Sequence, residues 1–153
     1  MEKFRNFIIL FFATSIGTGY FPFASGTISA LLVGFPIYWL IKENIFIYFL
    51  IIFFLIILGC FTSHKAEQIL KEKDSKKITI DEVVGLLIAF WGISINIKLL
   101  LLGFLINRGL DIIKPFPINK TQKFPGGIGI MADDILAGIV SNIILKIISI
   151  NLL

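Results

Sequence analysis

Long apolar runs separated by short polar breaks dominate the chain. The first run, from Phe4 to Ile16, is short for a helix that crosses a bilayer, which needs about 20 apolar residues, so we expect it to lie at the membrane interface. The runs Ile28 to Ile41 and Ile45 to Phe61 each predict a membrane helix. The polar turn Lys42–Asn44 between them predicts a helical hairpin.

Two polar segments interrupt this pattern. The segment from Gly17 to Thr27 contains proline and repeated glycine, which predicts either a bend between membrane elements or a loop that contacts a headgroup. The segment from Thr62 to Lys77 predicts a polar loop, in which Ala66 to Lys73 forms a short helical stretch on the membrane surface.

The run from Val83 to Ile106 is too long for one untilted span and carries polar residues in its middle. We interpret it as two short helices joined by a turn near Ser94 to Lys98. This turn returns the end of the second helix, with Arg108 and Asp111, to the side on which the first helix begins, at Asp81. A single span would instead place Arg108 opposite Asp81.

Proline ends the next helix at Pro115-Phe116-Pro117, because proline lacks a backbone N–H and restrains the residue before it. A loop with Lys120 and Lys123 follows, and then a glycine-rich stretch from Gly126 to Gly129. Ile135 to Ile150 predicts the last helix. These elements predict an all-α, polytopic membrane bundle of about five membrane segments plus a short interfacial helix.

Composition supports a single membrane-embedded domain over residues 1–153, because 57% of the residues are hydrophobic and only 16% are charged. The basic start followed by an apolar stretch resembles a secretory signal, but further membrane runs follow it, so we expect it to remain in the mature chain. The single cysteine, Cys60, excludes a disulfide within the chain.

Basic residues give the chain a net charge of +4 and cluster in the polar loop after the second membrane helix. The clustered residues are Lys65, Lys71, Lys73, Lys76 and Lys77. Such a cluster indicates a cytoplasmic loop under the positive-inside rule, or a patch for anionic lipid headgroups. We do not expect nucleic acid as a partner, and the pattern leaves the oligomeric state open.

Half of the ten acidic residues flank apolar segments, where a charge is costly and therefore indicates function. They are Asp81, Glu82, Asp111, Asp133 and Asp134. The predicted topology places all of them on the cytoplasmic face. Clustered carboxylates repel one another unless a cation or protons neutralise them, and their hard oxygen atoms suit magnesium.

Arg108, Asp111 and Lys114 follow one another at steps of three and therefore share one helix face. The two cations could hold a phosphate while Asp111 contacts a metal, since the planar guanidinium group binds two oxygen atoms at once. The same spacing also fits a charge-compensated helix end without a ligand.

Glycine precedes the last pair of acids. Backbone amides at Gly126 and Gly127 could cradle an anion before a helix that starts near Asp133 and Asp134. A plain loop with an aspartate cap fits as well. Gly138, one turn after Asp134, would allow a second helix to approach closely.

Several phosphatase chemistries are excluded by what the chain lacks. His64 is the only histidine, so a phosphohistidine mechanism has no second histidine as acid. Cys60 has no arginine shortly after it, which excludes a cysteine-phosphatase loop, and there is no Asp-x-Asp pair. Water activated by a metal remains as the route for phosphate hydrolysis.

Three sequence blocks resemble the signatures of the phosphatidylglycerophosphatase A family, in the family's order and over nearly the whole chain. They are Asp81-Glu82-Val83-Val84-Gly85, the run from Arg108 to Ile118 with its two prolines, and the run from Gly126 to Gly138. Gly17-Thr18-Gly19 and Gly26-Thr27 resemble the N-terminal block, although Ser25 stands where the family usually has proline.

This resemblance implies a bacterial inner-membrane enzyme that uses magnesium to hydrolyse phosphatidylglycerophosphate to phosphatidylglycerol, the last step of phosphatidylglycerol synthesis. As metal ligands we predict Asp81, Glu82, Asp133 and Asp134. As catalytic residues we predict Arg108, Asp111, Lys114 and Asp134, with Asp111 as a further ligand or general base. Arg108, Lys114, Gly126 and Gly127 are the residues predicted to bind the substrate phosphate.

Two other classes of protein fit parts of the pattern. A cation transporter or channel subunit would also collect carboxylates among membrane helices, but its polar residues should continue through the bilayer, whereas these acids stop at one face. A structural membrane scaffold is the other class, but it would have no evident need for two adjacent acids beside a glycine-rich stretch.

Overall fold

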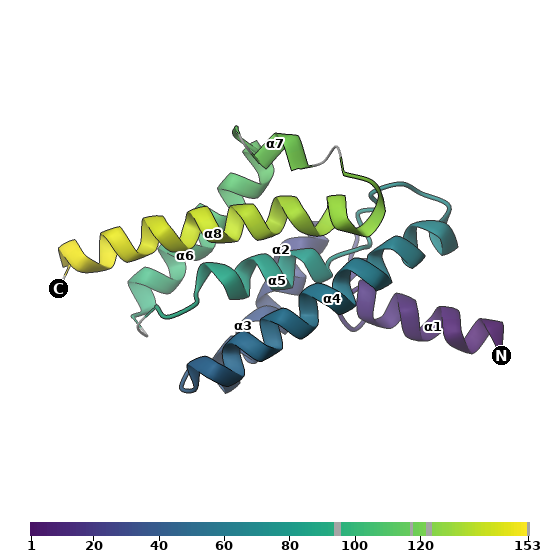
Figure 1. Ribbon diagram of the computed structural model, residues 1–153, viewed down its shortest axis with the longest axis horizontal. Coiled ribbons are helices and arrows are strands. Elements are labelled where there is room, and N and C mark those ends of the chain that lie inside the picture. Colours follow the sequence, from purple (N-terminus) through teal and green to yellow (C-terminus); the bar gives the residue numbers. More distant parts are fainter. Residues whose placement is uncertain (94–95, 117, 122–123, 153) are drawn as a thin grey trace.

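The computed structural model describes residues 1–93, 96–116, 118–121 and 124–152, and all regular structure within them is helical (Figure 1). The elements are α1 (Glu2–Ala13), the single turn η1 (Thr18–Tyr20), α2 (Ser25–Ser29), the π-helical η2 (Ala30–Gly34), α3 (Phe35–Ile41), α4 (Ile45–Leu70), α5 (Ile80–Ala89), α6 (Ile97–Ile113), α7 (Ile118–Thr121) and α8 (Gly126–Leu152). The predicted all-α class is confirmed.

Two long helices, α4 and α8, run in opposite directions along the molecule (Figure 1). Among the described residues, only Ile45–Leu70 and Gly126–Ile150 are long and apolar enough to cross a bilayer. The elements α2, η2 and α3 follow one another without a break and form a shorter apolar helix, Ser25–Ile41. The count of five membrane segments and the interfacial position of α1 stay predictions.

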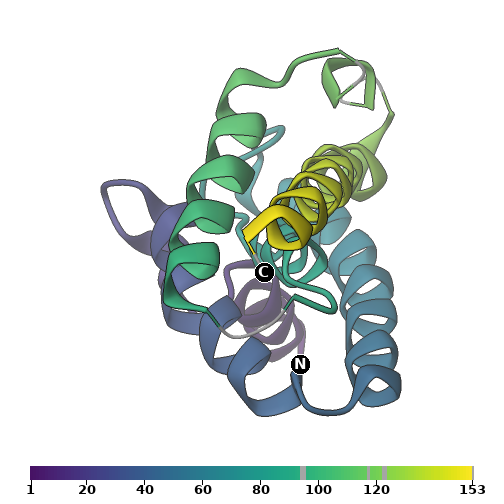
Figure 2. The same ribbon diagram turned by 90° about the vertical axis from the view of Figure 1, so that its left-hand side faces the viewer.

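The short helix α5 forms the centre of the bundle. It packs against α4, α6, α8 and the Ser25–Ile41 helix (Figures 1 and 2), and all of its residues except Glu82 are buried. Glycine brings α5 and α8 together, because a Cβ atom added to Gly138 would lie 2.5 Å from the carbonyl oxygen of Gly85. The predicted close approach at Gly138 is confirmed.

The C-terminal end of α5 finds its hydrogen-bond partners inside the protein. The side-chain amide of Asn142 on α8 donates to the carbonyl oxygens of Ala89 and Trp91, at 2.9 and 2.8 Å. Carbonyls at the end of a helix need such partners where water is absent. The chain then returns as α6, which confirms the two predicted helices, although Ser94 and Ile95 of the predicted turn lie outside the described residues.

The predicted boundary of the second membrane helix at Phe61 is wrong, because α4 continues to Leu70. The predicted polar loop therefore begins nine residues later than Thr62. The intervening residues include strong helix formers, and Ser63 and Ala66 are fully buried against the rest of the bundle. Packing of the polar residues after Phe61 against the bundle therefore favours a helix that continues beyond its apolar part.

The predicted loop from Gly126 to Gly129 is also wrong, since these residues form the first turn of α8. A Cβ atom added to Gly127 would overlap with the carbonyl oxygen of Cys60 on α4, so glycine here permits helix packing. Asp133 and Asp134 consequently lie inside α8 and do not cap it. Two other residues singled out by the sequence, Pro117 and Lys123, lie outside the described residues.

Candidate active site

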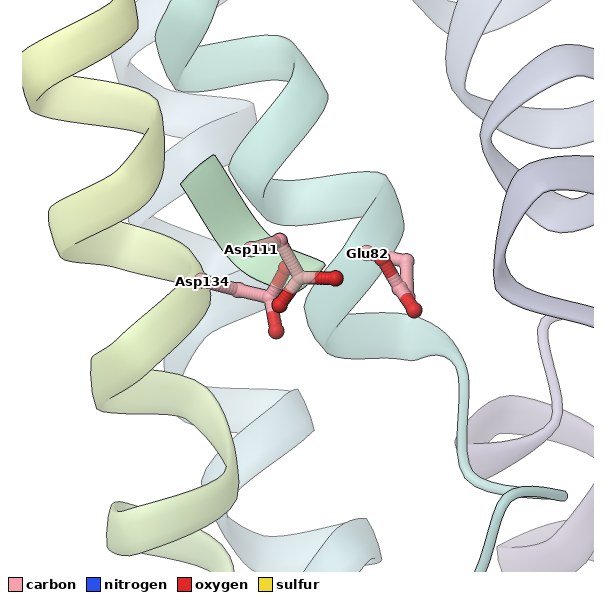
Figure 3. Close-up of side chains that lie close together, drawn as sticks. All are labelled: Glu82, Asp111 and Asp134. Carbon is pink, nitrogen blue, oxygen red and sulfur yellow. The ribbon is translucent and has the colours of Figure 1, made fainter. Parts of the chain in front are cut away.

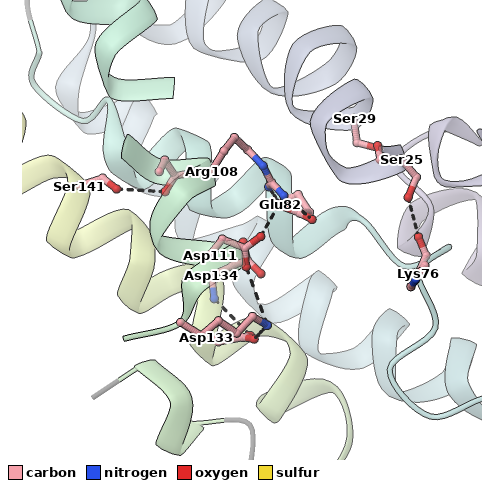
Figure 4. Close-up of polar contacts among 11 residues, drawn as sticks. Ser25, Ser29, Lys76, Glu82, Arg108, Asp111, Asp133, Asp134 and Ser141 are labelled. Atoms are coloured by element: carbon pink, nitrogen blue, oxygen red, sulfur yellow. Dashed lines mark hydrogen bonds and ion pairs between the residues drawn. The ribbon is translucent and has the colours of Figure 1, made fainter. Parts of the chain in front are cut away.

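The five acids singled out by the sequence lie together at one end of α5, and Figures 3 and 4 show four of them, Glu82, Asp111, Asp133 and Asp134, converging from three helices. Asp81 and Glu82 begin α5, Asp111 ends α6, and Asp133 and Asp134 lie two turns into α8. Four of these side chains are buried, and that of Glu82 is partly buried. Their common location follows from the return of the chain between α5 and α6 and from the glycine contact between α5 and α8.

Three of these carboxylates are close enough to share a cation. Glu82, Asp111 and Asp134 each present an oxygen atom within 4.8 Å of the others (Figure 3). Within the described part of the chain, one oxygen of Asp134 and one of Asp81 are buried without a hydrogen-bond partner. Buried polar atoms normally have partners, so hard oxygen donors in this state fit a divalent cation.

The closest group differs from the predicted set of metal ligands. Asp111, which we expected as a further ligand or general base, belongs to this group together with Glu82 and Asp134. Asp133 is instead paired with the ammonium group of Lys114. Asp81 is buried nearby.

Two cations hold the carboxylates together (Figure 4). Arg108 forms an ion pair with Glu82, and its Nη2 donates to Oδ2 of Asp111 at 2.9 Å. Lys114 pairs with Asp133, and its Nζ is 3.9 Å from Oδ1 of Asp111. Arg108 and Asp111 therefore share a face of α6 as the spacing predicted, whereas Lys114 is the residue after the helix and still approaches Asp111. Ion pairs connect the ends of three helices.

Negative charge remains in excess at this site, because five carboxylates face two cations. Burial raises the pKa of Asp81 well above its usual value, and the charges of Asp133 and Asp111 raise it further. Burial also raises the pKa of Asp111, against the opposing effect of Arg108 and Lys114. A bound divalent cation would remove this repulsion.

A cavity of about 790 Å³ opens beside the cluster. The acids, Arg108, Ile112 and Lys114 form part of its lining, and the segments 19–27 and 74–78 form the rest. The sequence had indicated the glycine-bearing segment as a possible headgroup loop. It did not place Lys76 and Lys77 at this cavity, because the lysine cluster was interpreted as a sign of a cytoplasmic loop or as a patch for anionic lipid headgroups, separate from the acids.

Gly26 controls how closely the 19–27 segment approaches the carboxylates. A Cβ atom at this position would overlap with Oε1 of Glu82. We expect Gly26→Ala to displace Glu82 and lower the turnover rate about tenfold or more, since small misplacements at an active site have large effects. Gly109→Ala, on α6 with open space around its Cβ position, is the matched control. Equal phosphatase rates for both variants would contradict this role.

Gly126, Gly127 and His64 lie apart from this cavity. Gly127 is buried against α4, and the Cβ position of Gly126 touches the ring of His64. The ring is exposed and lies 3.2 Å from the side-chain nitrogen of Gln68. Gly126 does border a small neighbouring pocket together with Asp133, and the phosphate-binding role of the two glycines stays a prediction.

Comparison with known proteins identifies the family. The sequence model of the phosphatidylglycerophosphatase A family matches residues 11–149. The chain belongs to this family. Membership makes it a lipid phosphatase, and two of its described helices have the length and composition of helices that cross a membrane.

Three curated relatives are similar to the chain over most of its length. The phosphatidylglycerophosphatase A of Haemophilus influenzae is 35% identical over 86% of the chain and 83% of its own length, and that of Escherichia coli is 32% identical over 84% and 76%. A Bacteroides thetaiotaomicron protein named "Putative phosphatidylinositol-3-phosphatase" is 32% identical over 95% and 96%. No solved structure matches the chain.

Proposed function

We propose that the chain hydrolyses phosphatidylglycerophosphate to phosphatidylglycerol and phosphate with the help of Mg²⁺, as the last step of phosphatidylglycerol synthesis. The observation that carries this proposal is the group formed by Glu82, Asp111 and Asp134, with Arg108 beside it, on a cavity at one end of the bundle. Family membership supports the reaction, and the carboxylate group supports the metal.

In this mechanism Glu82, Asp111 and Asp134 would hold Mg²⁺, and Asp81 lines the same cavity. A metal bound there would supply Lewis acidity, which polarises a phosphoryl oxygen and lowers the pKa of water. Arg108 donates its guanidinium hydrogens to the phosphate oxygens and stabilises the charge of the transition state.

Lys114 and Asp133 extend the site on the side of α8. Lys114 donates to a phosphate oxygen while Asp133 fixes the position of its ammonium group. Asp111 contacts both cations. In the alternative in which it does not bind the metal, Asp111 is the general base that takes a proton from the attacking water. The leaving glycerol oxygen is protonated by water from the open cavity.

The position of the carboxylate cluster along α4 supports a substrate held in the bilayer. Ile80, next to Asp81, packs at Gly59, where a Cβ atom would lie 3.6 Å from its Cγ2. Gly59 is near the point where the apolar part of α4 gives way to Thr62 and the polar turns. The cluster therefore lies near the level of lipid headgroups, which we propose to be on the cytoplasmic face of a multi-pass inner-membrane protein.

The Bacteroides relative favours a second candidate substrate, phosphatidylinositol 3-phosphate. Both lipids carry a phosphate monoester on a headgroup that a phosphodiester joins to diacylglycerol. The carboxylate group by itself would also suit a cation transporter, but the comparisons name phosphatases.

Purified protein assayed on each lipid tests the proposal. We expect phosphate release from phosphatidylglycerophosphate with Mg²⁺, loss of that release in EDTA, and its return when excess Mg²⁺ is added. Faster release from phosphatidylinositol 3-phosphate would favour the second candidate. Release from neither lipid, or release that EDTA does not affect, would contradict the proposed reaction or its metal.

A further inference from the structure

The catalytic cavity has a second basic wall, formed by Lys76 and Lys77. These residues line the same cavity as Glu82, Arg108 and Asp111 but approach it from the loop between α4 and α5. Figure 4 shows Lys76 beside Ser25, apart from the carboxylates and Arg108. The cavity therefore presents cationic groups at two separate places.

The backbone of this wall is held in place by several contacts. The hydroxyl group of Ser25 donates to the carbonyl oxygen of Lys76 at 2.8 Å, and the N–H of Thr79 donates to the carbonyl oxygen of Ala13 at 2.9 Å. Gly19 lies so close to Lys77 that a Cβ atom would overlap with the carbonyl oxygen of Lys77. These contacts fix where the two lysine side chains begin.

The charge of the wall is available for a ligand. Arg108 and Lys114 are both paired with carboxylates, whereas neither Lys76 nor Lys77 forms an ion pair with a carboxylate of the described residues. The Nζ atom of Lys77 lies 5.8 Å from the centre of the Tyr20 ring. Asp74 also lines the cavity, so two lysines oppose one acid and leave the wall positive.

An apolar rim borders the same cavity. Phe21, Phe23 and Ile112 line it, and 51%, 82% and 74% of their surfaces are exposed. The loop that carries the two phenylalanines projects from the bundle at the left of Figure 2. Exposed apolar side chains beside a lipid phosphatase site suit contact with acyl chains.

We propose that Lys76 and Lys77 bind the phosphodiester group that joins the headgroup of the lipid to diacylglycerol. This inference rests on the proposed function, in which the monoester lies at Arg108 and Asp111. The diacylglycerol would then contact the apolar rim, and the phosphodiester would contact the lysine wall. The monoester would lie at the carboxylates. The headgroups named by both kinds of relative contain this phosphodiester, whereas phosphatidic acid lacks it, so the wall selects lipids with two phosphates.

Binding of phosphatidylglycerol, which has the phosphodiester but no monoester, tests the wall without catalysis. Titrated in uncharged detergent micelles, the double variant Lys76→Gln/Lys77→Gln should bind this lipid about tenfold more weakly, as expected for a lost charged hydrogen bond. The matched control is Lys71→Gln/Lys73→Gln, which removes the same charge from the same loop but outside this cavity. Diacylglycerol, which has no phosphate, should bind all three proteins equally.

Steady-state kinetics provide a second test of the lysine wall. The KM for phosphatidylglycerophosphate should rise about tenfold in the double variant with little change in kcat, and Lys77→Arg should retain a low KM. Unchanged phosphatidylglycerol binding in the double variant, or equal weakening in the control variant, would overturn the proposal. If the unaltered protein releases no phosphate but the double variant still loses phosphatidylglycerol binding, the proposed reaction fails and the lysine wall stands.

Discussion

Replacement of Asp134 by asparagine should abolish magnesium-dependent phosphate release and yet stabilise the metal-free protein. Asp134 is buried, has an oxygen atom without a partner among the described residues, and lies within 4.8 Å of Glu82 and Asp111. Asparagine keeps the size of the side chain but removes a charge that a metal needs. We expect kcat to fall on the order of a thousandfold, as when a group that stabilises transition-state charge is lost.

The gain in stability follows from the excess of acids at the site. Removing one buried carboxylate from a group of five should raise the free energy of unfolding by on the order of 1 to 3 kcal/mol when EDTA is present. Thermal unfolding in detergent with EDTA or with Mg²⁺ measures this effect. Magnesium should then stabilise the unaltered protein more than the variant, because the variant lacks one of the proposed ligands.

Glu43→Gln is the control for this experiment, because it removes the same charge at an exposed position in the turn before α4. It should change neither the rate nor the stability in EDTA. An Asp134→Asn protein with full activity would contradict the metal site. A loss of both activity and EDTA stability would show that Asp134 has a structural role instead.

The sequence predicted the members of this site better than their arrangement. The spacing of Arg108, Asp111 and Lys114 is local, and a helix places such residues on one face whatever surrounds it. The turn after α5 was predictable too, because polar residues interrupt an apolar run that is too long for one span. These two features alone bring the acids of α5 and α6 to the same end of the bundle.

The choice of the closest carboxylates was not predictable, because it depends on how two helices cross. Gly85 and Gly138 let α8 approach α5, and this contact brings Asp134 toward Glu82 while Asp133 pairs with Lys114. The prediction of a loop at the glycines before Asp133 was wrong for a related reason. Glycine is common both in loops and where helices pack closely, and only the contact of Gly127 with α4 decides between them.

Loss of Arg108 should have the opposite effect to loss of Asp134 on the stability of the metal-free protein. Its guanidinium group pairs with Glu82 and Asp111, which are two of the three carboxylates that can share a cation. In the proposed mechanism, Arg108 and Mg²⁺ would therefore compete for these two carboxylates. A metal that neutralised the carboxylates would leave the guanidinium group available to the substrate phosphate.

Replacement of Arg108 by glutamine should consequently lower kcat about a hundredfold or more, since a donor to the transition-state charge is lost. In EDTA the variant should unfold more easily, by about 3 kcal/mol, because breaking a mostly buried ion pair leaves carboxylates uncompensated. Half-maximal thermal stabilisation should nevertheless occur at a lower Mg²⁺ concentration than in the unaltered protein, because the competing cation is gone. Magnesium should thus rescue the stability of the variant but not its activity.

Thermal unfolding across a magnesium titration, run beside the phosphate-release assay, separates these effects. Lys98→Gln removes a cation from the exposed opposite end of α6 and should leave the metal dependence and the rate unchanged. A weaker response to Mg²⁺ in Arg108→Gln would show that the arginine assists metal binding and does not compete with it. Asp134 and Arg108 differ in the sign of their effect on metal-free stability for one reason: the site holds more acids than bases, so losing an acid relieves repulsion and losing a base increases it.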